Sequence, residues 1–242
     1  MLFTDTINQC AEVAGMLWQC GWAERNGGNL VVNITSDVDD NIRRLPPLTA
    51  PLTIGAKLEA IAGQYFYCKA TGCRMRDLAR KPMDNGVIIR IQPSGEEYEI
   101  VACKALQPTS ELPSHLAIHN YLATTAPEKK ASLHTHPTEL VALSHVKELC
   151  NTEKMNETLW AMIPETRLFC QKGLGFLPYA EPGSQALADG TLELLHRHDA
   201  ILWEKHGVIA VGNDVMDAFD TVDILNKAAQ IRCAIPSFKI KL

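Results

Sequence analysis

Two histidines separated by one threonine form the sharpest local signal in this sequence. The stretch LHTHP at 133–137 follows apolar residues, which predicts a short strand over 131–136. Residues two apart in a strand point to the same face, so His134 and His136 would project together. Two such imidazoles can supply two ligands of a tetrahedral or five-coordinate zinc site, although a surface strand can also carry this pair without a metal.

A third imidazole has to come from another part of the chain. His206 ends the strand-like run 200–206 and precedes Gly207, so it is well placed to reach the end of a neighbouring strand. His196 and His198 are the rival pair, but they lie at the polar end of a predicted helix, where residues two apart do not share a face. We expect that pair to form a solvated helix end whose charge suits the helix dipole.

Acidic and imidazole side chains recur at intervals of four from Glu111 through His115 to His119, and would therefore share one helical face. A metal motif of the form Glu-x3-His-x3-His is one interpretation. Apolar neighbours indicate instead that both histidines are packed on the buried side or hydrogen-bonded. Glu111 differs because hydroxyl residues that favour a helix cap precede it. A carboxylate at the start of a helix can enter a cleft.

Three turns rich in glycine or hydroxyl groups could bind an anion through their backbone N–H groups. They are residues 26–29, which read NGGN, the pair Thr71-Gly72 and the pair Thr109-Ser110. None of them matches the P-loop or the dinucleotide fingerprint, so nucleotide binding is not supported. Each turn alone is more often only a turn, and only a fold that brings them together would make them a phosphate cradle.

The elements that must position these residues alternate between helices and strands, which predicts an α/β protein. Helical spacing predicts helices over 5–20, from about 111, and over 138–149, 153–162, 184–198 and 213–233. Strands are predicted over 30–34, 65–69, 86–91, 97–103, 131–136, 176–179, 200–206 and 208–211. Residues 36–52 have the composition of an excursion loop. No repeat or linker divides the chain, so we expect residues 1–242 to form a single domain.

The composition excludes several classes of protein. The chain has 242 residues, of which 46% are hydrophobic, as in ordinary globular proteins. A net charge of −5 without a basic block argues against nucleic-acid binding. No run approaches the ~18 apolar residues of a membrane span, and the N-terminus lacks a signal-peptide pattern. The eight cysteines form no CxxC pair. We therefore expect free thiols and a cytoplasmic protein without a membrane partner.

Four stretches, in the same order, resemble the class II aldolase family. They are GWAERNGGNL at 21–30, PTSELP at 108–113, HTHP at 134–137 and HG at 206–207. Within this family the first two stretches are most similar to the members that cleave rhamnulose 1-phosphate. The resemblance implies a single three-layer α/β/α domain around a mostly antiparallel sheet. It also implies a cyclic homotetramer with active sites at the subunit interfaces.

The resemblance further implies the parts of an active site. One Zn²⁺ per subunit would be held by His134, His136 and His206. Glu111 would be the catalytic acid/base, and can also coordinate the metal when substrate is absent. Glu165, in the stretch WAMIPE, would act near the aldehyde end from a neighbouring subunit. The phosphate of the substrate would lie among Asn26, Gly28, Asn29, Thr71, Gly72, Thr109 and Ser110.

The implied reaction is the reversible retro-aldol cleavage of a ketose 1-phosphate to dihydroxyacetone phosphate and L-lactaldehyde through a zinc-stabilised enediolate. Two features depart from the family pattern. Thr71-Gly72 stands where a Ser-Gly pair is expected, and the sequence ends at 236–242, where family members run longer. A role for a C-terminal tail in closing the site is therefore not predicted.

Other functions are compatible with the same scaffold. Fuculose-phosphate aldolases, pentulose-phosphate 4-epimerases and dehydratases of the family need the same three histidines. The fold also occurs in cytoskeletal scaffold proteins, but an intact set of His134, His136, His206 and Glu111 argues against a non-catalytic member. A purely structural zinc would require a fourth protein ligand and a closed coordination shell.

Overall fold

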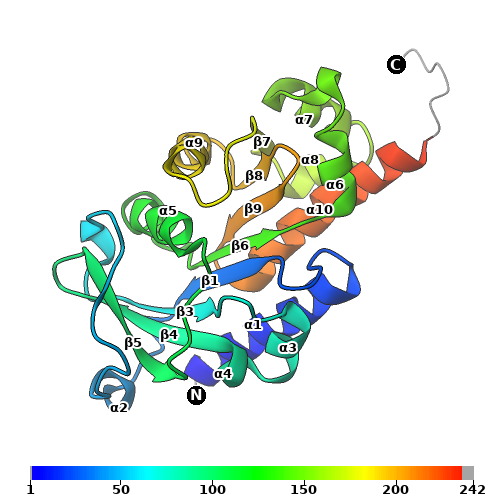
Figure 1. Cartoon of the computed structure of the whole chain (residues 1–242). Coiled ribbons are helices and arrows are strands. Elements are labelled where there is room, and N and C mark those ends of the chain that lie inside the picture. The colour runs from blue at the N-terminus through cyan, green and yellow to red at the C-terminus, as the bar shows by residue number, and fades with distance from the viewer. Residues whose placement is uncertain (1, 236–242) are drawn as a thin grey trace.

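A computed structural model describes residues 2–235 of the chain, and one sheet runs through the whole of it (Figure 1). The strands are β1 (Asn29–Asn33), β2 (Leu52–Thr53), β3 (Tyr65–Lys69), β4 (Gly86–Ile91), β5 (Glu97–Cys103), β6 (Ala131–Thr135), β7 (Leu174–Leu177), β8 (Ala200–Trp203) and β9 (Gly207–Gly212). Their order in the sheet is β2-β5-β4-β3-β1-β6-β9-β8-β7. Only β7 and β8 pair in parallel, so the predicted α/β fold with a mostly antiparallel sheet is confirmed.

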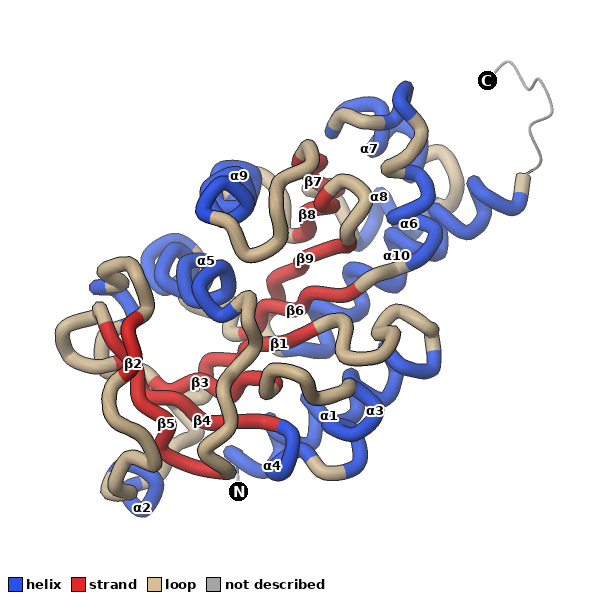
Figure 2. Tube along the Cα trace, in the orientation of Figure 1, coloured by secondary structure: helices blue, strands red, loops and turns tan. Residues whose placement is uncertain are grey.

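Helices cover both faces of this sheet (Figure 2). The α-helices are α1 (Leu2–Gln19), α2 (Asp40–Arg43), α3 (Met75–Arg80), α4 (Pro82–Asn85), α5 (Leu112–Thr125), α6 (Thr138–Leu143), α7 (Thr152–Trp160), α8 (Pro164–Phe169), α9 (Gln185–Leu195) and α10 (Val215–Ala234). Two short 3₁₀ turns are η1 (Glu59–Ile61) and η2 (Lys147–Leu149). Helices α5 and α9 lie on one face, whereas α1, α10 and α6 lie on the other. The result is the predicted three-layer α/β/α arrangement.

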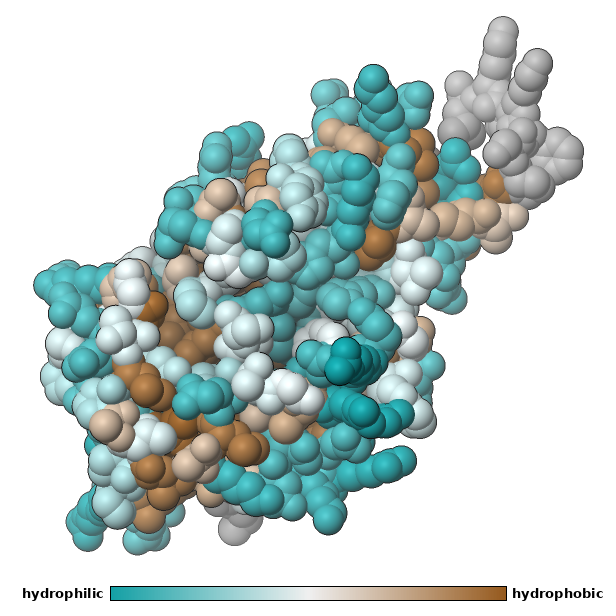
Figure 3. Space-filling model, in the orientation of Figure 1, coloured by the Kyte–Doolittle hydropathy of each residue, from teal (hydrophilic) through white to brown (hydrophobic). Residues whose placement is uncertain are grey.

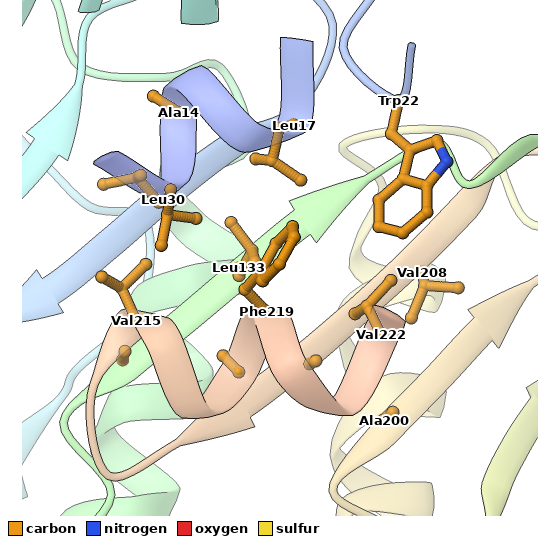
Figure 4. Close-up of a cluster of buried hydrophobic side chains, with 14 of the residues drawn as sticks. Ala14, Leu17, Trp22, Leu30, Leu133, Ala200, Val208, Val215, Phe219 and Val222 are labelled. Atoms are coloured by element: carbon orange, nitrogen blue, oxygen red, sulfur yellow. The ribbon is translucent and has the colours of Figure 1, made fainter. Parts of the chain in front are cut away.

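The alternation of side chains along β1 shows why the sheet needs two helical layers. Leu30 and Val32 belong to the cluster packed against α1 and α10, whereas Val31 belongs to the cluster beneath α5. Successive side chains of a strand point to opposite faces, so an apolar run buries both of them. Each fully buried side chain of this size contributes roughly 1.5–3 kcal/mol. In Figure 4, Leu133 of β6 and Phe219 of α10 meet within the first cluster.

Several predicted boundaries were wrong where a tertiary contact ends an element early. The helix expected over 138–149 ends at Leu143, because the Ser144 hydroxyl donates to the Val141 carbonyl at 2.6 Å and accepts the Lys205 N–H at 2.8 Å. The strand expected over 200–206 ends at Trp203, and a turn follows in which Lys205 has a φ of 60°.

Two further boundaries shift, and some short elements lack a sequence signal. The helix expected over 184–198 ends at Leu195, and the strand expected over 176–179 begins at Leu174. The loop expected over 36–52 contains α2, which Asp39 caps. Helix α3 was not predicted, since a six-residue helix depends on packing, here of its buried Met75 against the core. Helices α4 and α8 were missed in the same way.

Two expectations concern the chain as a whole. Within residues 2–235 none of the helices has the length and apolar character that a membrane crossing requires. All eight cysteines lie in this range and none of them is joined to another. The expectation about the C-terminal stretch 236–242 falls outside the described residues.

Figure 3 shows a mostly hydrophilic face with hydrophobic residues gathered over the β2–β5 end of the sheet.

Candidate active site

The three histidines of the predicted metal site meet at the end of β6. His134 is on β6 and pairs with Ile209 of β9, His136 follows the strand directly, and His206 lies in the turn that connects β8 to β9. One ligand nitrogen from each side chain lies within 4.8 Å of the others. The Nε2 atoms of His134 and His136 are 3.2 Å apart. Strand spacing therefore aligned the two imidazoles as predicted, and the turn supplies the third.

Two of these imidazoles are held with their Nε2 lone pairs directed into the site. The Nδ1–H of His134 donates to the Val208 carbonyl at 3.0 Å, and the Nδ1–H of His136 donates to Glu24 Oε1 at 2.7 Å. A neutral imidazole protonated at Nδ1 exposes a lone pair at Nε2. Two facing lone pairs at 3.2 Å repel each other, and a cation between them removes that repulsion. This donor set fits a divalent metal with nitrogen ligands.

Burial favours the neutral form that a metal requires in His134 and His206. His134 is 1% exposed, and burial lowers its pKa well below the usual value. Burial also lowers the pKa of His206, whose Nδ1 is buried without a hydrogen-bond partner in residues 2–235. The indole ring of Trp203 packs against both rings, with centroid distances of 4.6 Å and 5.2 Å. A metal therefore does not have to displace protons from these two nitrogens.

Backbone packing fixes the position of the three rings. The carbonyl of Trp22 accepts the Thr135 hydroxyl at 2.7 Å and the His136 N–H at 2.9 Å, which ties the end of β6 to the core. A Cβ on Gly207 would lie 2.5 Å from the Thr135 carbonyl and 2.9 Å from Cε1 of His134. Glycine is therefore the residue that lets the His206 turn approach the other two histidines.

Glu111 lies beside this cluster at the start of α5, as the sequence predicted. It occupies the N-cap position, and its side chain is largely buried. Its Oε2 lies 3.8 Å from Nε2 of His134, and its Oε1 lies 3.9 Å from Nε2 of His206. Asn29 donates from Nδ2 to Oε2 at 2.8 Å. A carboxylate in this position can move a proton to or from a molecule bound against the histidines.

A cavity of about 150 Å³ joins the histidines and Glu111 to the three predicted anion-binding turns. Every residue expected to contact the phosphate lines it, and Gly27 and Lys69 line it as well. The complete lining is Asn26, Gly27, Gly28, Asn29, Lys69, Thr71, Gly72, Thr109, Ser110, Glu111, His134, His136 and His206. The turns are tied together, because the Thr71 N–H donates to the Gln107 carbonyl and the Thr109 N–H to that of Lys69.

Lys69 is the residue of this cavity that the sequence analysis missed. It ends β3, is 3% exposed, and donates from Nζ to the Asn26 carbonyl at 2.9 Å. Burial lowers its pKa to about 8, against the opposing influence of Cys73 and Glu111. The available signal was a lysine at the end of the buried strand YFYCK, directly before the turn at 71–72. Lysine is rarely buried without a functional or ionic partner.

The remaining predicted residues lie elsewhere. His115 and His119 are buried and hydrogen-bonded outside the metal cluster, which confirms that they are core residues. His196 bonds the Tyr121 hydroxyl at 3.0 Å and His198 bonds the Lys172 carbonyl at 2.6 Å, so neither joins the site. Glu165 is exposed in the first turn of α8 and does not line the cavity.

Comparison with known proteins agrees with this fold. The model of the class II aldolase and adducin N-terminal domain family matches residues 8–233. The chain is 53% identical over 228 residues to the rhamnulose-1-phosphate aldolase of Bacteroides thetaiotaomicron, covering 94% of this chain and 85% of that one. It is 32% identical to the rhamnulose-1-phosphate aldolase of Pectobacterium carotovorum, covering 91% and 82%.

Solved structures show the same architecture. A sugar-phosphate aldolase from Thermotoga maritima has a TM-score of 0.82 at 33% identity, covering 95% of this chain and 94% of that one. The L-fuculose-1-phosphate aldolase of Thermus thermophilus has a TM-score of 0.58 at 17% identity, covering 95% and 93%, and this likeness concerns the fold alone. The chain belongs to the class II aldolase and adducin N-terminal domain family.

Proposed function

We propose that this chain is an aldolase that cleaves L-rhamnulose 1-phosphate reversibly to dihydroxyacetone phosphate and L-lactaldehyde. The observation that carries the proposal is the polar cavity that holds three imidazoles, Glu111 and the anion-binding turns together. The names of the Bacteroides and Pectobacterium relatives support this substrate over the sister sugar phosphates.

We also propose that residues 1–242 act as one domain and that the protein is cytoplasmic, in keeping with its unpaired cysteines.

His134, His136 and His206 would hold one Zn²⁺ per subunit. Three protein ligands leave coordination positions open, as a catalytic zinc site requires. When bound, the ion supplies Lewis-acid stabilisation of the negative charge that develops on the substrate oxygens, worth several kcal/mol. Its affinity depends on the ligand orientation described above, including the bond between His136 and Glu24.

Glu111 would carry the proton of the reaction. In the cleavage direction the C3–C4 bond of the ketose breaks, the electron pair stays on C3, and the C4 hydroxyl gives its proton to solvent as the aldehyde forms. Glu111 takes up a proton from solvent and delivers it to C3 of the dihydroxyacetone phosphate fragment. In the synthetic direction it removes that proton. Its two oxygens lie within 4 Å of the imidazoles, so a substrate bound there would present C3 to the carboxylate.

The phosphate would lie among Asn26, Gly28, Asn29, Thr71, Gly72, Thr109 and Ser110, with Lys69 as the cation. The pH dependence of kcat/KM tests this role. Lys69 is charged below its pKa of about 8 and neutral above it, so its attraction for phosphate is lost as the pH rises through that value. We expect kcat/KM, which reports the free enzyme, to fall above about pH 8.

The matched variant for this pH dependence is Lys69→Arg, because a guanidinium stays charged throughout this range. Its kcat/KM should stay level where that of the unmodified enzyme falls. Steady-state kinetics from about pH 6.5 to about pH 9.5 with fixed zinc would measure both profiles. An equal fall in the arginine variant would assign the pH dependence to another group.

Assembly into a homotetramer, with Glu165 reaching the site of a neighbour, is also part of the proposal. Glu165 is exposed on α8, next to Leu168 and Phe169, which are 62% and 70% exposed. Exposed apolar side chains of this size are typical of protein–protein interfaces. We expect Phe169→Asp to give smaller oligomers in light scattering and to lose activity together with assembly. A tetramer that persists unchanged would exclude α8 from the interface.

A substrate panel tests the proposed reaction. Zinc-loaded protein would be given rhamnulose 1-phosphate, fuculose 1-phosphate and ribulose 5-phosphate, and release of dihydroxyacetone phosphate would be followed. We expect the fastest release from rhamnulose 1-phosphate, loss of activity with a chelator, and recovery with zinc. Epimerisation of the pentulose phosphate without release of dihydroxyacetone phosphate would assign the sister function instead.

A further inference from the structure

A continuous chain of buried hydrogen bonds leads from the core to Glu111. It crosses from α5 to the sheet, where α5 lies over β1 and β6 (Figure 2). Its members are His119 and His115, one turn apart on α5, Ser132 on β6, and Asn29 on β1. The last bond is the one from Asn29 to Glu111. His115, His119 and Ser132 lie outside the cavity lining, and the mechanism above assigns them no role.

The direction of each bond follows from what each group can donate. The Asn29 amide donates from Nδ2 to the carboxylate oxygen Oε2 of Glu111 at 2.8 Å. Its Oδ1 then faces Nε2 of His115. A carbonyl oxygen only accepts, so Nε2 of His115 carries a hydrogen. Burial lowers the pKa of His115 to about 3, so the ring is neutral and its Nδ1 is an acceptor.

The remaining bonds continue in the same direction. The Ser132 hydroxyl lies 2.6 Å from Nδ1 of His115 and 3.3 Å from the Val31 carbonyl, and it donates its only hydrogen over the shorter distance, to His115. Its oxygen accepts from Nε2 of His119 at 3.0 Å, and the same N–H also reaches the Val31 carbonyl at 3.1 Å. Every donor in the chain therefore points toward the carboxylate. If the Asn29 amide were reversed, its oxygen would face Glu111 and its NH₂ would face the N–H of His115. Two acceptors and two donors would then oppose each other, so the observed orientation is favoured.

We propose that His115 is a positioning residue for the carboxylate. Held as the Nε2–H tautomer by Ser132, it fixes the orientation of the Asn29 amide, and this amide holds Glu111 between His134 and His206. The inference rests on the proposed function, since it assigns the importance of that position to proton transfer by Glu111. Displacements of about 1 Å at a reacting group can lower a rate on the order of 10²-fold.

The tautomer can be read without any activity measurement. In zinc-loaded protein with ¹⁵N-labelled histidine, NMR correlations between ring nitrogens and carbon-bound protons distinguish the two neutral forms. The resonance of His115 would be identified by its absence in the His115→Gln variant. We expect a neutral ring with hydrogen on Nε2 at neutral pH. An Nδ1–H tautomer or an imidazolium would overturn the proposed chain of donors.

Variants separate positioning from packing. His115→Phe removes the donor, and we expect kcat to fall about 10- to 100-fold. KM and zinc content should change little. His115→Gln, whose amide nitrogen can replace Nε2 as the donor, should recover most of kcat. Leu122→Ala is the matched control, since Leu122 is buried on the same helix α5 and has no part in the chain of hydrogen bonds. It should lower the stability to a similar extent without a comparable loss of kcat.

The kcat values of these variants decide whether His115 positions the carboxylate. An unchanged kcat in His115→Phe, or an equal loss in Leu122→Ala, would overturn the positioning role. In the Glu111→Gln background, His115→Phe should have no further effect on kcat, because the carboxylate that it orients is absent. If the proposed function were wrong, the variants would give a different pattern of results. Glu111→Gln would then keep a near-normal rate, whereas the tautomer of His115 could still match the expected form.

Discussion

Replacing Glu111 by glutamine is expected to lower the cleavage rate by about 10²- to 10⁴-fold, the range of general acid–base catalysis. The glutamine side chain keeps the shape of the carboxylate and can still bond Asn29 after its amide reorients. It cannot accept or deliver the proton of the dihydroxyacetone phosphate fragment. Steady-state cleavage of rhamnulose 1-phosphate at saturating zinc measures the effect, which should fall on kcat rather than on KM.

Zinc content is the control for this variant. The three histidines are unchanged, so Glu111→Gln should bind one zinc per subunit as the unmodified protein does. Glu148→Gln, an exposed position outside the cavity lining, provides the matched surface change and should keep full activity. A cleavage rate near normal in Glu111→Gln would remove the proton-transfer role from this residue.

Replacing His206 by alanine is expected to abolish stoichiometric zinc binding and, with it, the cleavage activity. Only His134 and His136 would remain, and two imidazoles do not complete a tetrahedral site. Metal analysis after dialysis against trace-metal-free buffer would measure the loss. Partial recovery of activity at high zinc concentration would agree with this prediction, because the substitution weakens the affinity for zinc and leaves Glu111 in place.

His196→Ala is the matched control for the metal site, since His196 bonds Tyr121 outside the cavity. It should keep full zinc occupancy and full activity. Full occupancy in His206→Ala would show that the third ligand is misassigned. Thermal unfolding after zinc removal adds a separate test. If the zinc is catalytic, the protein stays folded after the metal is removed, whereas removal of a structural zinc would unfold it.

The predictable part of the fold depends on local patterns. The runs at 86–91 and 97–103, joined by a Gly-containing turn, form the hairpin β4–β5, because apolar strand residues and turn residues act over short distances. The helix from 213 onward also has a local origin, since the Asp214 side chain accepts from the N–H of Asp217 at its first turn.

The unpredictable part depends on contacts between distant segments. The break after Leu143 requires Ser144 to meet Lys205, which is 61 residues away in the sequence. The short helix α3 forms because its apolar residues pack against α1. Periodicity contains no information about either contact, so these elements become visible only in the folded chain.

In the candidate site, too, local patterns predict some residues, and contacts between distant segments determine the others. The spacing of His134 and His136 predicts their common direction from strand geometry alone. Choosing His206 as the third ligand depends on β9 lying next to β6, which a strand pattern does not reveal. The place of His206 at a strand end before Gly207 favoured it, and the resemblance to the aldolase family supported that choice. Lys69 was missed because its place in the cavity depends on the neighbouring Asn26 turn, 43 residues away in the sequence.

Exchange of hydrogen on dihydroxyacetone phosphate tests the central claim most directly. Zinc-loaded protein would be incubated with dihydroxyacetone phosphate alone in D₂O, and the substrate followed by proton NMR. We predict replacement of one of the two hydrogens on the carbon that becomes C3 of the ketose, with no exchange in Glu111→Gln or after zinc removal. No exchange by the unmodified enzyme, or equal exchange by Glu111→Gln, would contradict the account.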